Sequence, residues 1–124
     1  MIAMMHHGLV RHWKWQDKVM GDYIVADWEK HAASMAKAGI RMVFTGHFHA
    51  NDISEYVSWT DKIYDIETGS TVSYPMPYRM VTLHDGEASV DTRYVKHLPG
   101  IMSESELESK ARQYASSSIS AIVS

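Results

Sequence analysis

Two pairs of histidines, each at the end of a short apolar run, are the side chains in this sequence best suited to binding a metal ion. His47 and His49 follow the run of residues 40–45, and Gly46 stands where the chain must turn. Imidazole nitrogen is the commonest neutral metal ligand, and two imidazoles on one tight turn could point at the same ion. Solvated surface histidines are also common, so this pair taken alone leaves an ordinary surface loop as the alternative.

The second pair, His6 and His7, strengthens the metal-site interpretation. It follows the apolar residues 2–5, and Gly8 favours a bend directly after it. Both apolar runs have the length and composition of buried strands. In an open α/β sheet, binding sites collect beyond the carboxyl ends of the strands. If the two strands are parallel neighbours, we therefore expect both histidine pairs to lie at one edge of the sheet.

A helix between the two strands would make them parallel, and the sequence predicts one. Asp22 suits the N-cap, Gly39 suits the stop, and apolar residues recur on one helical face. These residues are Ile24, Trp28, Ala32 and Met35. We expect His31, on the same helix, to be an ordinary partly exposed residue. The order of strand, helix and strand indicates a βαβ unit with a right-handed crossover.

Two polar segments flank the predicted helix and the second histidine pair. Residues 12–17 have no clear periodicity and indicate a loop or short helix. Trp13 and Trp15 are expected to pack against the protein body, with the border of a substrate cleft as the alternative. Residues 50–54 are turn-like, and Asn51 and Asp52 are expected to hold the histidine turn by local hydrogen bonds, with direct contact to a ligand as the alternative.

The second half of the sequence predicts short strands and a last helix. Expected strands cover residues 62–67, 71–74, 78–84 and 87–95. The last two form a hairpin, because Asp85-Gly86 is a two-residue turn sequence. Ser103 and Glu106 match a capping box, followed by Leu107, Ala111 and Tyr114 on one helical face. We expect His84 and His97 to be structural.

Length and composition fit one domain and exclude few functions. The 124 residues are 45% hydrophobic, carry a net charge of −3 and include no cysteine. No nucleic-acid partner is expected, because no run of Lys or Arg stands out. No apolar run approaches the roughly 20 residues that span a bilayer, and no signal peptide is recognisable. Localisation and redox compartment stay undetermined.

Taken together, Met4-Met5-His6-His7 and Thr45-Gly46-His47-Phe48-His49 resemble the C-terminal motifs of the calcineurin-like metallophosphoesterases. The Gly-His-x-His match is complete, and the resemblance covers mainly residues 1–50. It implies an α/β fold, the C-terminal half of a two-sheet sandwich with flanking helices, in which residues 1–124 form a single partial domain. It also implies hydrolysis of a phosphate ester at a dinuclear centre that binds phosphate oxygens and activates water.

Carried over by position, the resemblance implies a role for each histidine of the two pairs. His6 and His47 would bind one divalent ion, and His49 would bind the other. His7 would either support a ligand or approach the substrate. Manganese, iron and zinc all stay open as the metal, and no catalytic residue is assigned within this chain.

The sequence departs from the family in its N-terminal motifs. Asp-x-His, Gly-Asp-x-x-Asp and Gly-Asn-His-Asp/Glu should precede the His-His pair, but only five residues do. We therefore expect a C-terminal fragment, inactive or nearly so alone, whose other ligands come from missing sequence or another chain. A noncatalytic metal-binding module and a self-associating module are the alternatives. Uncovered sheet edges would favour a homo-oligomer.

Overall fold

The computed structural model describes the backbone of residues 1–123 and the side chains of residues 1–118. The fold is mixed α/β, as the sequence predicts. The chain divides into two compact units, Met1–Thr68 and Gly69–Ser124. The first unit carries both histidine pairs, and the second carries the predicted hairpin and the last helix.

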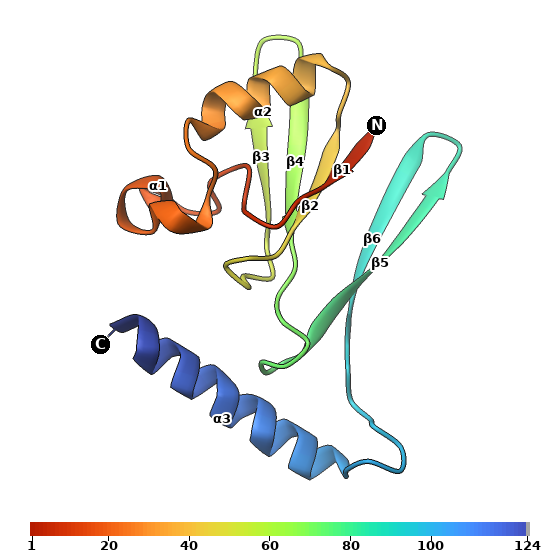
Figure 1. The fold of residues 1–124 in the computed structure, drawn as a ribbon. Helices are drawn as coiled ribbons and strands as arrows, with labels where there is room; N and C mark the ends of the chain where they lie inside the picture. The colour runs from red at the N-terminus through yellow and green to blue at the C-terminus, as the bar shows by residue number, and fades with distance from the viewer. Residues whose placement is uncertain (124) are drawn as a thin grey trace. The chain divides into compact units, whose positions relative to one another are not determined.

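A four-stranded sheet with the order β1-β2-β4-β3 forms the frame of the first unit (Figure 1). The strands are β1 (Ile2–Met4), β2 (Met42–Thr45), β3 (Ile53–Val57) and β4 (Lys62–Glu67). β1 pairs with β2 in parallel, with Met4 opposite Phe44, and β2 pairs in parallel with β4. The predicted parallel arrangement of the two histidine-bearing strands is therefore confirmed.

Helix α2 (Trp28–Lys37) covers one face of this sheet (Figure 1). Ala32 and Ala36 are fully buried against Val43 of β2 and Ile63 of β4. Leu9 and Val10 complete the core, while Trp28 and Met35 pack at its margin. The predicted apolar face of the helix is thus the face that meets the sheet.

The helix begins later than the sequence predicts, because the residues before it are used elsewhere. Residues Gly21–Tyr23 form a short 3-10 turn, η1, and Ile24 is extended. The N–H of Gly8 donates to the carbonyl of Tyr23, and the N–H of Val25 donates to the carbonyl of Gly8. Backbone pairing with the segment after His6-His7 therefore prevails over the helical pattern. The short helix α1 (Gln16–Val19) begins near the end of residues 12–17 and extends beyond them.

Strand β3 is a second departure from the sequence-based expectation. We expected residues 50–54 to be a turn, but Ile53 and Ser54 begin a strand antiparallel to β4. The polar residues 50–52 do form a connection, but from Ile53 onward pairing with β4 holds the chain extended. β3 is an edge strand whose side chains alternate between exposed and half-buried.

The second unit contains a two-stranded hairpin, β5 (Pro77–His84) and β6 (Glu87–Tyr94). Asp85 and Gly86 join the strands with φ values of 46° and 82°, as a tight hairpin turn requires. The predicted hairpin is therefore confirmed. The strand expected at residues 71–74 is wrong, because consecutive turns occupy this segment.

Helix α3 (Glu104–Val123) begins at the predicted capping box. The N–H of Ser103 donates to the Glu106 carboxylate at 2.9 Å, and Glu106 N–H lies 3.4 Å from Ser103 Oγ. Leu107 and Ala111 are buried against Met76, whereas Tyr114 is largely exposed. Within residues 1–123, no helix combines the length and apolar character needed to cross a bilayer.

Candidate metal centre

The two histidine turns lie side by side at the carboxyl ends of β1 and β2. The backbone N–H groups of Gly46 and His47 both donate to the carbonyl of His6, at 3.2 and 3.0 Å. His49 has a φ of 62°, and its N–H donates back to the Gly46 carbonyl at 3.3 Å. The parallel pairing of β1 with β2 and these hydrogen bonds together hold the His6-His7 turn against the His47–His49 turn.

Three imidazoles gather above this backbone. His6 Nε2 and His47 Nδ1 are 2.7 Å apart, within hydrogen-bond distance. The ring of His47 lies 4.4 Å from the ring of His7 and 4.5 Å from that of His6, centroid to centroid. Tyr23 contributes a fourth ring, 4.9 Å from His47. The sequence-based expectation that the two pairs converge is met for His6, His7 and His47.

The electrostatic surroundings of His47 favour its neutral form. Desolvation lowers the pKa of His47 most, followed by the neighbouring imidazoles of His7, His6 and His49. This also places His49 within electrostatic range of the cluster. A lowered pKa leaves the imidazole uncharged at neutral pH, and only an uncharged imidazole has a lone pair for a metal ion.

The donor chemistry fits a single divalent ion, but the distances are those of a hydrogen bond. Two nitrogens bound to one tetrahedral ion would lie about 3.4 Å apart, given metal–nitrogen bonds of about 2.0–2.1 Å. His6 Nε2 and His47 Nδ1, at 2.7 Å, would have to separate to admit the ion. Within residues 1–123, no group of three or more His, Asp or Glu side chains is already arranged around a metal position.

Behind the first histidine turn lies a buried carboxylate that the sequence did not single out. Asp65 of β4 is fully buried, and its Oδ2 accepts the N–H groups of Leu9 and Val10 at 2.6 and 2.8 Å. Its Oδ1 accepts the hydroxyl of Thr45 at 2.6 Å. Asp65 therefore binds the chain just after His6-His7 to the residue just before Gly46.

His12 links this carboxylate to two others. Its side chain is 2% exposed, and its Nδ1 donates to Asp52 Oδ2 at 2.9 Å. Its Nε2 lies 3.6 Å from both Asp65 Oδ2 and Glu67 Oε2. Burial lowers the pKa of His12, but Asp65, Asp52 and the charge of Glu67 together outweigh burial, so that the pKa is raised. The three acidic neighbours therefore favour the protonated form of the His12 imidazole.

The contacts of Asp52 correct the expectation for residues 50–54. Asp52 does hold the segment after the histidine turn, but through His12 and through backbone bonds to Glu67, which are distant in sequence. One pattern could have revealed the cluster. Asp65 and Glu67 alternate in phase with Ile63, whose side chain belongs on the buried face of the predicted strand. Two acids on a buried face are rare and call for partners.

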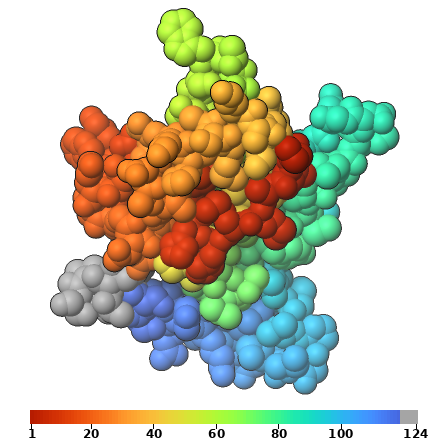
Figure 2. All heavy atoms as spheres, turned by 45° about the horizontal axis from the view of Figure 1, so that its top comes forward, coloured from red at the N-terminus to blue at the C-terminus, as the bar shows by residue number. Residues whose placement is uncertain are grey.

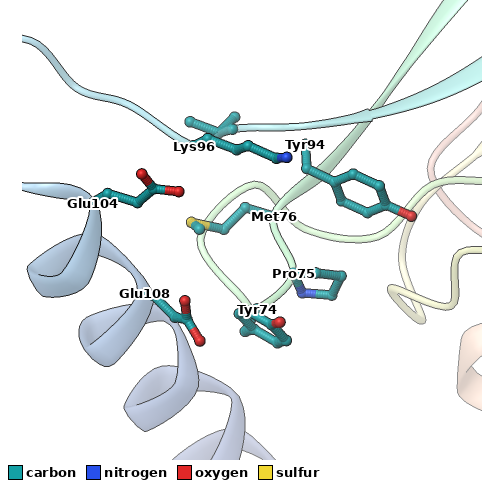
Figure 3. A pocket seen from close by; sticks show the side chains of 8 residues that line it. Tyr74, Pro75, Met76, Tyr94, Lys96, Glu104 and Glu108 are labelled. Atoms are coloured by element: carbon teal, nitrogen blue, oxygen red, sulfur yellow. The ribbon is translucent and has the colours of Figure 1, made fainter.

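A separate open pocket of about 430 Å³ lies within the second unit (Figure 3). Met76 points into it between Lys96 on one side and Glu104 and Glu108 of α3 on the other. His84 and His97 are highly exposed; His84 Nε2 lies 3.2 Å from Asp85 Oδ2, and His97 Nδ1 lies 4.0 Å from Glu104 Oε2. The pocket walls include no residue of either histidine pair.

Comparison of the sequence with protein-family models and with curated proteins finds no match. The parallel strands β1 and β2 bring His6, His7 and His47 together independently of any such match.

Proposed function

We propose that this chain belongs to a metal-dependent phosphoesterase of the calcineurin-like type and supplies histidine ligands to its metal centre. The observation that carries the proposal is the approach of His6 and His47, from the ends of two neighbouring parallel strands, to 2.7 Å between ring nitrogens. Two imidazoles held at such a distance by the backbone need only a small separation to share an ion.

Each histidine has a distinct role in this proposal. His6 and His47 hold one divalent ion, and His49, two residues after His47, binds a second ion. His7, whose ring lies beside that of His47, either supports His47 as a metal ligand or contacts the substrate. Manganese, iron or zinc, when bound, would hold the phosphate oxygens and activate a water for attack on phosphorus. The ring of Tyr23 lies beside that of His47, with 4.9 Å between the ring centroids.

The centre would be completed by ligands that this sequence does not contain. The described imidazoles are neutral donors, whereas a two-ion site also needs anionic ligands to bridge and balance the charge. The Asp and Asn motifs of the family are absent from the sequence. In this proposal the chain corresponds to the C-terminal part of such an enzyme and shows little or no turnover alone.

A metal titration tests this proposal. Cobalt(II) bound to the purified chain should give visible absorption bands, and His47→Ala should weaken binding at least tenfold. The matched control is His31→Ala, which removes an exposed histidine of α2 and should leave binding unchanged. Hydrolysis of an aryl phosphate with added manganese is measured in parallel and should stay near background. Absence of binding, or equal binding by both variants, would contradict the proposal.

A second candidate function, self-association, is favoured by the outer edge of the sheet. β1 pairs only with β2 within the described sheet, and Met4 is 84% exposed on it. Figure 2 shows the N-terminal segment, in red, on the visible surface of the first unit. Met1 and Ile2 extend this apolar edge. Exposed apolar edge strands pair readily with other chains. Sedimentation velocity across a range of concentrations should show a dimer that Met4→Lys disrupts, and a concentration-independent monomer would exclude it.

A further inference from the structure

Glu67 lies at the end of β4, directly between the two ends of the His47–His49 turn. The N–H of Thr68 donates to the carbonyl of Thr45, which precedes the turn, at 3.0 Å. Glu67 exchanges two backbone hydrogen bonds with Asp52, which follows the turn, at 3.0 and 3.2 Å. The backbone of Glu67 is therefore fixed relative to both ends of the segment that carries the histidines.

The side chain of Glu67 is buried under the same turn, with the residue only 1% exposed. Its carboxylate interacts with the backbone N–H groups of Phe48 and Ala50. Burial raises the pKa of Glu67 and outweighs the opposing effect of His12 and of these two N–H groups. The two N–H groups belong to the peptide units that directly follow His47 and His49. One carboxylate therefore contacts the backbone next to both histidines.

We propose that Glu67 is a positioning residue: its carboxylate binds the N–H groups of Phe48 and Ala50 and thereby sets the directions of the His47 and His49 imidazoles. His12 holds this carboxylate in place, because its Nε2 lies 3.6 Å from Glu67 Oε2 while its Nδ1 binds Asp52. The consequence for metal binding rests on the proposed function, whereas the backbone contacts do not.

The chemistry of the contact explains why an acid occupies this position. A buried carboxylate is unfavourable unless several donors surround it, and a turn of alternating N–H groups offers two donors at once. An apolar residue would fill the volume but leave both N–H groups unsatisfied. Asp65 acts in the same way on the first turn, where it binds the N–H groups of Leu9 and Val10.

Amide hydrogen exchange tests the backbone contact without any metal. The amides of Phe48 and Ala50 should be protected in the wild-type chain and should exchange at least tenfold faster in Glu67→Leu. Glu67→Gln, which keeps one acceptor oxygen, should have an intermediate effect and serves if Glu67→Leu does not fold. The matched control is Ile63→Val, a buried change on the same face of β4. A folded Glu67→Leu variant in which both amides stay as protected as in the wild type would overturn the inference; if Glu67→Leu does not fold, unchanged protection of both amides in Glu67→Gln counts against it.

Cobalt(II) affinity tests the positioning role itself. Loss of groups that orient metal ligands typically lowers affinity 10- to 100-fold, and we expect this for Glu67→Leu, with a smaller loss for Glu67→Gln. Ile63→Val, which lowers stability without touching the turn, should bind cobalt as the wild type does. A folded Glu67→Leu variant with affinity within threefold of the wild type would overturn the positioning role. If the wild type itself binds no cobalt, the proposed function fails, and amide exchange alone then decides whether Glu67 holds the turn.

Discussion

The two units of the chain treat their charged side chains in opposite ways. In Met1–Thr68, Asp65 and Glu67 are at most 1% exposed and surround His12. In Gly69–Ser124, the charged residues of α3 are exposed, as in the ion pair of Arg112 with Glu108. The apolar core of the second unit is small and consists of Met76, Leu107 and Ala111 with their neighbours.

The first unit buries its acidic side chains beside the histidine turns, whereas the second unit keeps the charged residues of α3 exposed. Burying charge is unfavourable, so a small protein does it where the geometry of a site requires fixed polar contacts. In the first unit, Asp65 fixes the chain after His6-His7, and Glu67 lies under the His47–His49 turn. In the second unit, a tight turn, a capping box and a few apolar contacts suffice.

Removal of Asp65 should show the largest effect in the molecule. Asp65→Ala leaves the N–H groups of Leu9 and Val10 and the hydroxyl of Thr45 without their acceptor. We expect the free energy of unfolding to fall by about 3–5 kcal/mol, or the unit not to fold. Urea unfolding followed by tryptophan fluorescence measures it, since all four tryptophans lie in the first unit.

Glu55→Ala is the matched control for Asp65→Ala. Glu55 is an exposed carboxylate of the same sheet, paired with Lys62 at the surface. Its removal should change the unfolding curve far less, because surface ion pairs contribute little to stability. Similar effects of the two substitutions would remove the distinction between buried and exposed charge.

Removal of Leu107 is the corresponding test in the second unit. Leu107→Ala opens a cavity against Met76 and Ala111, and we expect a loss of about 2–3 kcal/mol. Circular dichroism at 222 nm during urea unfolding measures it through α3. Lys110→Ala, an exposed change on the same helix, should have almost no effect. A negligible loss in Leu107→Ala would mean that α3 does not depend on this apolar contact.

The raised pKa of His12 predicts that the stability of the first unit depends on pH. Asp52, Asp65 and Glu67 face His12 and help raise its pKa above 6.5. The stability that His12 contributes should therefore be complete below pH 6.5 and be lost as pH rises through the raised pKa. Its slope can reach about 1.4 kcal/mol per pH unit, the limit for one proton.

The measurement compares the wild type with His12→Gln by tryptophan fluorescence from pH 5 to pH 9. The difference between their unfolding free energies should shrink as pH rises across this window. A constant difference would show that His12 contributes the same stability whether charged or neutral, and a growing difference would reverse the sign expected from its carboxylate neighbours.

The smallest expected effect is at the start of α3. Ser103→Ala removes the side-chain oxygen that caps the helix, and N-cap losses amount to about 1 kcal/mol. Thermal unfolding followed at 222 nm should show a lower midpoint. Ser117→Ala, in the exposed interior of the same helix, should be neutral or slightly stabilising, because alanine is the better helix former. If Ser117→Ala lowers the unfolding midpoint as much as Ser103→Ala does, the Ser103 side chain does not stabilise the helix as an N-cap.

What the sequence predicts correctly depends on how far apart the interacting residues are. The hairpin at Asp85-Gly86 and the capping box of Ser103 are local, with partners within a few residues, and both are confirmed. The parallel pairing of β1 with β2 also follows from a general rule about crossover connections.

The buried cluster could not be found in the same way. Asp65 and Leu9 are 56 residues apart in the sequence, and His12 and Asp52 are 40 apart. The late start of α2 has the same origin, because residues 23–25 pair with Gly8. Local patterns therefore located the histidine turns but could not identify the side chains that fix them.

The central claim is that histidines from two strand ends form one metal-binding group. Long-range ¹H–¹⁵N NMR spectra of the eight histidines during a zinc titration test it most directly. The ring nitrogens of His6 and His47 should shift together and saturate at the same zinc concentration, while those of His31 and His84 stay in place. Independent, unsaturated shifts at all eight rings would contradict the claim.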